Sequence, residues 1–124
     1  MIQLLAIGLG GACGSILRFL TAGKVQAWFG GDFPLGIFTV NLLGSFIMGV
    51  LATIFIARFD LNSVWREAIL IGVLGGFTTF SGFSMGVVNL FKNGAELQAL
   101  LYIFASVLFC VLAAWLGVLL GRSL

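Results

Sequence analysis

Long uncharged apolar runs separate the charged residues of this sequence, and they limit its fold more than any other feature. The runs cover residues 1–17, 33–57, 68–91 and 97–121. Because about 20 apolar residues cross the hydrocarbon core of a bilayer as one helix, each run predicts one crossing. We expect the short first run to continue past Arg18 towards Ala22, with the guanidinium group reaching the interface or a wet cavity.

The sequence therefore predicts an all-α membrane protein, built as a single four-helix membrane domain over residues 1–124. The predicted spans cover about residues 2–26, 34–57, 67–91 and 96–121. Composition excludes a soluble globular protein, since 61% of the residues are hydrophobic, mean hydropathy is +1.23, and only 8% are charged, against roughly 25% in soluble domains. The start, "MIQLLAIGLGG", lacks the basic region of a signal peptide, so we expect the first helix to be retained.

The spans carry few groups that perform covalent or metal chemistry. Cys13 and Cys110 lie inside predicted spans, where a thiol behaves as a small hydrophobic group, and the sequence has no histidine. We therefore expect neither a disulfide nor a zinc centre. Because the spans also lack a catalytic base and an activated nucleophile, we expect that the protein is not an enzyme.

The basic residues divide evenly between the two sides of the membrane that four spans define. One side receives Arg58, Arg66 and Arg122, and the other receives Arg18, Lys24 and Lys92. Because the positive-inside rule depends on asymmetry, this tie has two interpretations: a wrong loop placement, or insertion in both orientations. We favour dual insertion, which allows two oppositely oriented copies to pair as an antiparallel homodimer.

The carboxylates, Asp32, Asp60, Glu67 and Glu96, all lie in loops or at span ends. Proton-coupled exporters use a titratable group at membrane depth. The small multidrug resistance family resembles this chain in architecture, but it relies on a glutamate in the first span, which is absent here. A coupled exporter of lipophilic cations is therefore the alternative function, supported by architecture alone.

Neutral hydrogen-bonding groups lie within the second and fourth spans. Asn41 sits inside the second run, where an unpaired amide is costly. It forms an interhelical hydrogen bond that holds the bundle together, or it lines an anion pathway as an N–H donor. Tyr102, Ser106 and Cys110 are spaced by four and share one helical face. They line a narrow wet track, or Tyr102 is an interfacial residue and Ser106 bonds its own backbone.

The stretch "LGGFTTFSGFS" at residues 74–84 places glycine, hydroxyl and aromatic residues in the middle of the third run. Gly75 and Gly76 weaken a helix, and Thr78, Thr79 and Ser81 offer hydroxyls to backbone groups that a break releases. Non-helical backbone at membrane depth occurs only where protein or water surrounds it, so the stretch predicts a functional break in the third helix. The alternative is an unbroken helix with a small-residue packing face.

Phe80 and Phe83 are three residues apart and share a face if the helix resumes after the break. Aromatic ring edges are positive, so they attract an anion weakly while they exclude water and cations. In a chain with 13 phenylalanines, ordinary packing in the core or against lipid also explains the pair.

Three strings together resemble one family: "GGACGSILRF" at 10–19, "GIFTVNLLGSFIMG" at 36–49 and "GGFTTFSGFS" at 75–84. The chain is similar to the Fluc (CrcB) family of bacterial fluoride channels, and the resemblance extends over all four spans. It implies a dual-topology antiparallel homodimer with two fluoride pores in the inner (plasma) membrane of a bacterium. The implied partners are a second copy of the chain, the lipid bilayer and fluoride, with no nucleic acid.

The resemblance also implies roles for individual residues. Asn41 would be the pore-lining amide donor, Phe80 and Phe83 the aromatic pair whose ring edges face fluoride, and Thr79 and Ser81 the hydroxyl donors beside it. Tyr102 and Ser106 would belong to a polar track, with Cys110 where a further hydroxyl is expected. Arg18 would lie near a pore entrance and favour anions, or it extends to lipid headgroups.

A structural sodium ion is implied at the dimer axis. The backbone carbonyls of Gly75 and Thr78 from both subunits would bind it, because carbonyl oxygens suit a hard cation. Two positions depart from the family pattern: Gly82 replaces a usual serine or threonine, and Gly86 stands where an acidic residue is common. These departures bear on ion throughput more than on the fold.

With no intramembrane acid and no nucleotide-binding loop to couple energy, the sequence predicts a passive channel. The resemblance implies that this channel is selective for fluoride and lets accumulated fluoride leave the cytoplasm. A third interpretation is a membrane scaffold that does not conduct.

Overall fold

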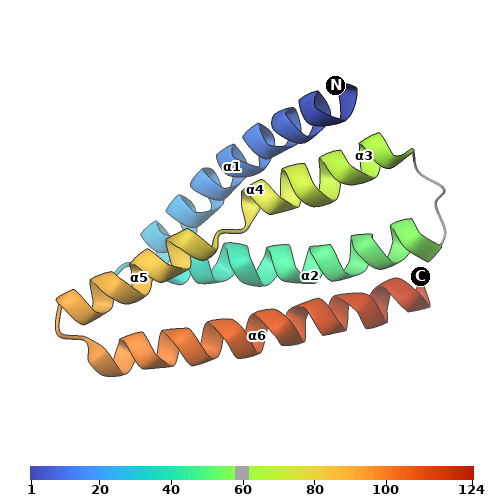
Figure 1. The fold of residues 1–124 in the computed structure, drawn as a ribbon. Helices are drawn as coiled ribbons and strands as arrows, with labels where there is room; N and C mark the ends of the chain where they lie inside the picture. Colours follow the sequence, from blue (N-terminus) through green and yellow to red (C-terminus); the bar gives the residue numbers. More distant parts are fainter. Residues whose placement is uncertain (58–61) are drawn as a thin grey trace.

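The computed structural model describes residues 1–57 and 62–124, and this part of the chain is helical (Figure 1). α1 (Ile2–Phe29) and α2 (Leu35–Ala57) precede a third span made of four pieces. The pieces are α3 (Ser63–Glu67), the π-helical segment η1 (Ala68–Leu74), α4 (Gly75–Phe77) and α5 (Phe80–Lys92), and α6 (Glu96–Ser123) follows. Arg58 and Asp60, which entered the charge analysis, lie outside the described residues.

Four segments are long and apolar enough to cross a membrane, namely Ile2–Phe29, Leu35–Ala57, Ser63–Lys92 and Glu96–Ser123. The protein is therefore a multi-pass membrane protein, as the apolar runs predict. α1 continues past the expected end near residue 26 and stops where Gly30 takes a positive φ of 63°. The third span starts before the expected residue 67, because the Asn62 side chain accepts a hydrogen bond from Val64 N and caps α3.

The helices pack in two groups. α1 lies along η1 and α4, while α2 lies along α6 (Figure 1). α5 leaves the first group after the break and packs against α6. The two chain termini, the end of α2 and the start of α3 lie at one end of the molecule, and the α1–α2 and α5–α6 turns lie at the other (Figure 1).

Glycines bring the helix backbones into contact in both groups. A Cβ at Gly72 would lie 2.8 Å from Ile7 O, and a Cβ at Gly49 would overlap Ala114 O. Because rigid backbone cannot move aside as a side chain can, these close approaches require glycine. The small-residue packing face that the sequence offered as an alternative to a break therefore exists together with the break.

The third span breaks after its glycine pair. Gly75 and Gly76 are helical, whereas Thr78 (φ −82°, ψ 155°) and Thr79 (φ −150°, ψ 114°) are extended. Gly76 instead lets α4 approach α1, since a Cβ there would lie 2.6 Å from Gly11 O. The third helix is broken as predicted, but the two threonines carry the extended backbone.

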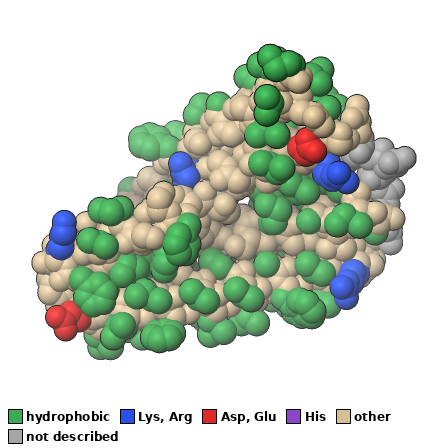
Figure 2. All heavy atoms as spheres, viewed as in Figure 1, with side chains coloured by type: hydrophobic (Ala, Val, Ile, Leu, Met, Phe, Trp, Pro, Cys, Tyr) green, Lys and Arg blue, Asp and Glu red, His purple; other side chains and the backbone are tan. Residues whose placement is uncertain are grey.

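Hydrophobic side chains cover much of the visible surface, and most of the charged side chains on that face lie towards its two ends (Figure 2). Arg18 differs, because it is half-buried within α1 and bonds the break. Its guanidinium group therefore lies at the break and not in a loop. Dual insertion stays a prediction.

Candidate functional site

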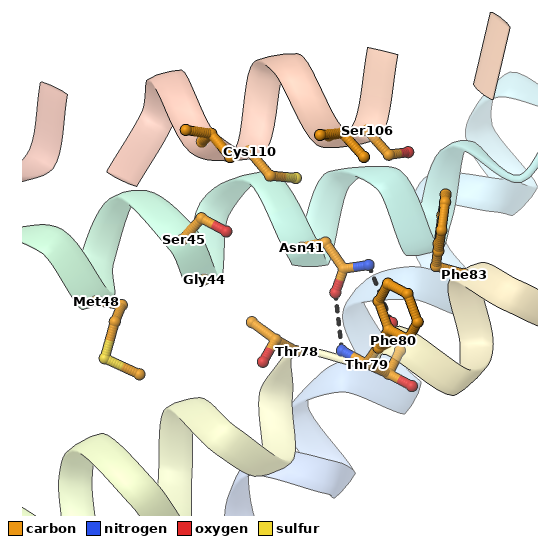
Figure 3. A pocket seen from close by; sticks show the side chains of 12 residues that line it. Asn41, Gly44, Ser45, Met48, Thr78, Thr79, Phe80, Phe83, Ser106 and Cys110 are labelled. Carbon is orange, nitrogen blue, oxygen red and sulfur yellow. Dashed lines mark hydrogen bonds between the residues drawn. The ribbon is translucent and has the colours of Figure 1, made fainter. Parts of the chain in front are cut away.

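The two extended residues of the break are hydrogen-bonded to side chains from two different helices. Asn41 of α2 bonds Thr79 through both ends of its amide (Figure 3): Nδ2 donates to Thr79 O at 3.1 Å, and Oδ1 accepts from Thr79 N at 2.8 Å. Arg18 of α1 donates from Nη1 to Thr78 O at 3.2 Å. Asn41 thus makes the interhelical bond of its first interpretation, and a second Nδ2 hydrogen remains for a ligand.

Thr79 also restarts the helix as the N-cap of α5. Its Oγ1 accepts from Gly82 N at 2.9 Å and lies 3.2 Å from Ser81 Oγ. The extended backbone of Thr79 is the conformation that an N-cap requires, because the side-chain oxygen must reach an amide in the first turn. The hydroxyls of Thr79 and Ser81 are therefore paired with each other at the start of α5.

A cavity of about 370 Å³ lies between α2, the break and α6 (Figure 3). Its described lining comprises Asn41, Gly44, Ser45, Met48, Thr78, Thr79, Phe80, Phe83, Ser106, Val107, Cys110 and Val111. This lining carries amide, hydroxyl, thiol and aromatic groups, and none of these described residues is charged. An anion in the cavity would therefore meet neutral groups alone.

The cavity brings together six residues that the sequence analysis named, from three elements: Asn41, Thr79, Phe80, Phe83, Ser106 and Cys110. Thr78, predicted for its carbonyl, adds its side chain to the lining, but its Oγ1 donates to Leu74 O at 3.0 Å. The other predicted residues, namely Arg18, Gly75, Ser81 and Tyr102, are not among the described lining.

The sequence analysis missed several lining residues. Ser45 follows Asn41 by four residues on α2, so the spacing argument applied to the fourth span would have found it. Met48, Val107 and Val111 carry no comparable signal, because apolar residues occupy most positions of every span.

A row of four aromatic rings leads from the cavity towards the α1–α2 turn. Phe80 lies 5.4 Å from Phe83, Phe83 lies 5.1 Å from Tyr102, and Tyr102 lies 5.4 Å from Phe33, measured between ring centroids. Phe80 is 78% exposed in the single chain, whereas Phe83 and Tyr102 are buried. Phe80 and Phe83 thus lie side by side, as their spacing predicts.

Two buried hydroxyls have no hydrogen-bond partner in the described structure, Tyr102 Oη and Ser106 Oγ. They belong to one face of α6, and Ser106 lines the cavity. Ser106 does not bond its own backbone, and Tyr102, with 0% exposure, is not an exposed interfacial residue. Because buried hydroxyls are nearly always paired, two such groups in successive turns mark a polar position inside the bundle.

The two departures from the family pattern are both close-packed glycines on α5. A Cβ at Gly82 would lie 2.8 Å from Thr79 Cγ2, and a Cβ at Gly86 would lie 3.1 Å from Tyr102 Cε1. Gly82 therefore adjoins the N-cap, and Gly86 adjoins the tyrosine ring. Both positions touch predicted site residues.

Two carbonyls at the break have lost the amide partners that a continuous helix would give them. The amide of Thr79, which would bond Gly75 O, donates to Asn41, and the amide of Gly82, which would bond Thr78 O, donates to Thr79 Oγ1. Carbonyl oxygens of this kind suit a hard cation such as sodium. The positive charge of Arg18 on Thr78 O opposes a cation at that oxygen.

These features define a class: a multi-pass membrane protein with a neutral cavity beside a broken helix. The family described as "CrcB-like protein, Camphor Resistance (CrcB)" matches residues 5–118. A relative from Magnetococcus marinus, named fluoride-specific ion channel FluC, is 47% identical over 97% of this chain and 98% of its own length. A relative of the same name from Hydrogenovibrio crunogenus is 40% identical over 99% of this chain and 93% of its own length.

A third relative, from Methylococcus capsulatus, also bears the name fluoride-specific ion channel FluC. It is 44% identical over 99% of this chain, which spans 54% of that relative's length. The chain belongs to the CrcB family, and the resemblance stated from the sequence is confirmed. Membership in a family whose curated relatives are named ion channels also confirms the prediction that the protein is not an enzyme.

Proposed function

We propose that this protein is a passive, fluoride-selective channel that lets fluoride leave the cytoplasm across a bacterial inner membrane. Two antiparallel copies of the single four-helix domain form the working unit, with two pores per dimer. Membership in the CrcB family supports this proposal, as do the FluC names of the relatives. The neutral, donor-bearing cavity beside the break is the part of this chain that fits it best.

The observation that carries the proposal is the buried, unpartnered hydroxyl of Ser106 on the cavity wall, with that of Tyr102 one helical turn away. A buried hydroxyl without a partner costs about 1–3 kcal/mol, so a role in ion passage accounts for its presence better than packing does. Fluoride accepts hydrogen bonds strongly. Donors at these depths replace part of its water shell.

The wall chemistry favours passage over retention. Asn41 Nδ2 and the Ser106 hydroxyl supply hydrogen-bond donors, and the edges of Phe80 and Phe83 add weakly positive contacts. Conduction needs binding that is weak and shared among several sites, and a fixed cation in the pathway would slow release. A pathway of neutral groups therefore suits rapid, uncoupled flow.

Arg18 acts from outside this wall. Its guanidinium group is held at the break through Thr78 O, so it contributes a positive potential near the pathway without lining the cavity. This arrangement attracts anions towards the break while the cavity itself stays neutral. Thr79 and Ser81 contribute by fixing the start of α5, since their hydroxyls are paired at its N-cap.

The second copy accounts for features that one chain leaves open. Phe80 is 78% exposed although it lines the cavity, so a partner that covers this face would complete the wall around the ring. The carbonyls of Gly75 and Thr78 have lost their helical amide partners. Their oxygens are suitable ligands for a sodium ion, which the breaks of the two copies would share. Arg18 weakens this fit at Thr78 O.

The test is an efflux assay on the purified protein in liposomes loaded with potassium fluoride, with potassium chloride as the matched control. A fluoride electrode should record rapid release, dependent on a potassium ionophore, while a chloride electrode records none. Equal release of both ions, or no fluoride release, would exclude the proposal. Proton-dependent ethidium transport in the same liposomes would favour the coupled exporter instead.

A further inference from the structure

The α1–α2 turn contains a side-chain clamp that the ion pathway described above does not include. Gln26, near the end of α1, donates from Nε2 to Gly31 O at 3.1 Å and to Phe33 O at 3.0 Å. Its Oε1 accepts from Gly36 N at 3.1 Å. That amide lies in the first turn of α2 and has no partner within its own helix. One half-buried side chain thus fixes both the turn and the start of α2.

Phe33 is carried by this turn and is the outermost ring of the aromatic row. It meets Tyr102 edge to face, with ring planes at 76° and centroids 5.4 Å apart. Tyr102 also contacts Phe83, and its Cε1 would lie 3.1 Å from a Cβ at Gly86. The tyrosine ring is therefore enclosed by α5 and by Phe33, and Phe33 is the neighbour that comes from a turn.

The turn depends on Gln26 for its shape. Gly30 and Gly31 both have positive φ, 63° and 75°, which leaves the backbone of this segment permissive. Among the described residues, Gln26 is the side chain that bonds this turn. Loss of its amide would let Phe33 shift, and edge-to-face contacts depend closely on ring offset.

We infer that Gln26 is a positioning residue for the ion pathway: through Phe33 it holds the Tyr102 ring so that its hydroxyl stays on the face of α6 shared with Ser106. This inference rests on the proposed function. A purely structural role would also follow from the three hydrogen bonds, since they join α1 to α2. A positioning role predicts that the Tyr102 ring changes its surroundings when Gln26 is replaced, whereas a purely structural role does not.

The sequence permits a direct measurement, because Tyr102 is its single tyrosine. Biosynthetic labelling with 3-fluorotyrosine gives one ring signal in a fluorine NMR spectrum of the full chain. Gln26→Leu removes all three hydrogen bonds, and Phe33→Leu removes the ring while it leaves the clamp. Gln3→Leu is the matched control, since Gln3 Nε2 donates to Ser63 Oγ at the opposite end of α1.

We expect both Gln26→Leu and Phe33→Leu to shift or broaden the Tyr102 signal, and Gln3→Leu to leave it unchanged. Fluoride efflux should fall about fivefold in Gln26→Leu and in Phe33→Leu and stay unchanged in Gln3→Leu. The double variant should lose little more, because both changes act on the same ring. Gln26→Glu keeps the acceptor for Gly36 N and should give an intermediate signal.

Slower efflux in Gln26→Leu with an unchanged Tyr102 signal would overturn the inference and leave a structural role. An unchanged signal in Phe33→Leu would overturn it as well, even if Gln26→Leu does not fold. The proposed function fails separately, when the unaltered protein releases no fluoride, because the NMR comparison does not require flux.

Discussion

The side-chain amide of Asn41 is bonded through both of its polar atoms to the backbone of a single residue, Thr79. The extended backbone at Thr79 takes its amide out of helical pairing, and Asn41 Oδ1 accepts from that amide instead, while Thr79 O accepts from both Asn41 Nδ2 and Phe83 N. The same amide stands on the wall of the cavity. One side chain therefore both bonds the break and lines the cavity.

Asn41→Leu should lower the free energy of unfolding by about 2 kcal/mol, because it leaves the amide of Thr79 without a partner and its carbonyl with the 3.4 Å bond from Phe83 N alone. Fluoride efflux should be lost at the same time. Denaturant unfolding in detergent and the liposome assay measure the two effects. Asn89→Leu is the control, since Asn89 is exposed on α5, and it should change neither quantity. A stable Asn41→Leu protein with normal efflux would contradict the assignment.

Ser106→Ala should change stability and flux in opposite directions. Removal of a buried hydroxyl without a partner should raise the free energy of unfolding by roughly 1 kcal/mol, while efflux falls. The control is Ser84→Ala, because Ser84 Oγ donates to Phe80 O at 2.9 Å and its loss should not stabilise the protein. If Ser106→Ala destabilises the protein, the hydroxyl is paired in the membrane and does not serve ion passage.

Phe80→Leu and Phe83→Leu should both slow fluoride efflux but differ in stability. Phe83 is 9% exposed and contacts both Phe80 and Tyr102, so its loss should lower the melting temperature, with a cost of about 1–2 kcal/mol. Phe80 is mostly exposed in one chain, so its replacement should leave the fold of that chain nearly unchanged. Phe104→Leu, at an exposed site on α6, should affect neither property. Normal efflux in both cavity variants would exclude the aromatic pair from the pathway.

Gly82→Ala and Gly86→Ala should separate the two departures from the family pattern. Alanine gains about 1 kcal/mol over glycine in a helix. At Gly82 this gain is offset by about 1 kcal/mol if Thr79 must leave its N-cap rotamer, so the net change should be small. At Gly86 a Cβ presses on the rings of Tyr102 and Pro34, which should cost about 1–3 kcal/mol and lower stability overall. If the Gly86→Ala protein is more stable than the unaltered protein, the Tyr102 ring can move aside to accommodate the added methyl group.

The number of spans and the broken third helix could be predicted because both depend on local composition. Charged residues end each apolar run, and a stretch of glycines and threonines stands where a membrane helix needs side chains that pack. The exact break could not be placed. Gly75 and Gly76 weaken a helix in isolation, but both are helical here, and Gly76 packs closely against Gly11 of α1. The side chains of Asn41 and Arg18 bond the two threonines from distant positions.

In the candidate site, too, features within one helix could be predicted, whereas contacts between helices could not. Spacing by four along a helix placed Ser106 and Tyr102 on one face, and they do share it. Spacing alone did not indicate that the Thr79 hydroxyl is used by the N-cap or that Arg18 reaches a carbonyl sixty positions away, at Thr78. Both outcomes depend on how separate helices meet, which a periodic pattern within one helix does not encode.

The two halves of the third span pack against different helices: α4 packs against α1, and α5 packs against α6. No helical ladder runs through Thr78 and Thr79 to transmit rotation from one half to the other. A continuous rod would turn every residue beyond an insertion by about 100°. Here substitutions can change the orientation of α5, and with it the rings of Phe80 and Phe83, while the close glycine contacts between α4 and α1 stay in register.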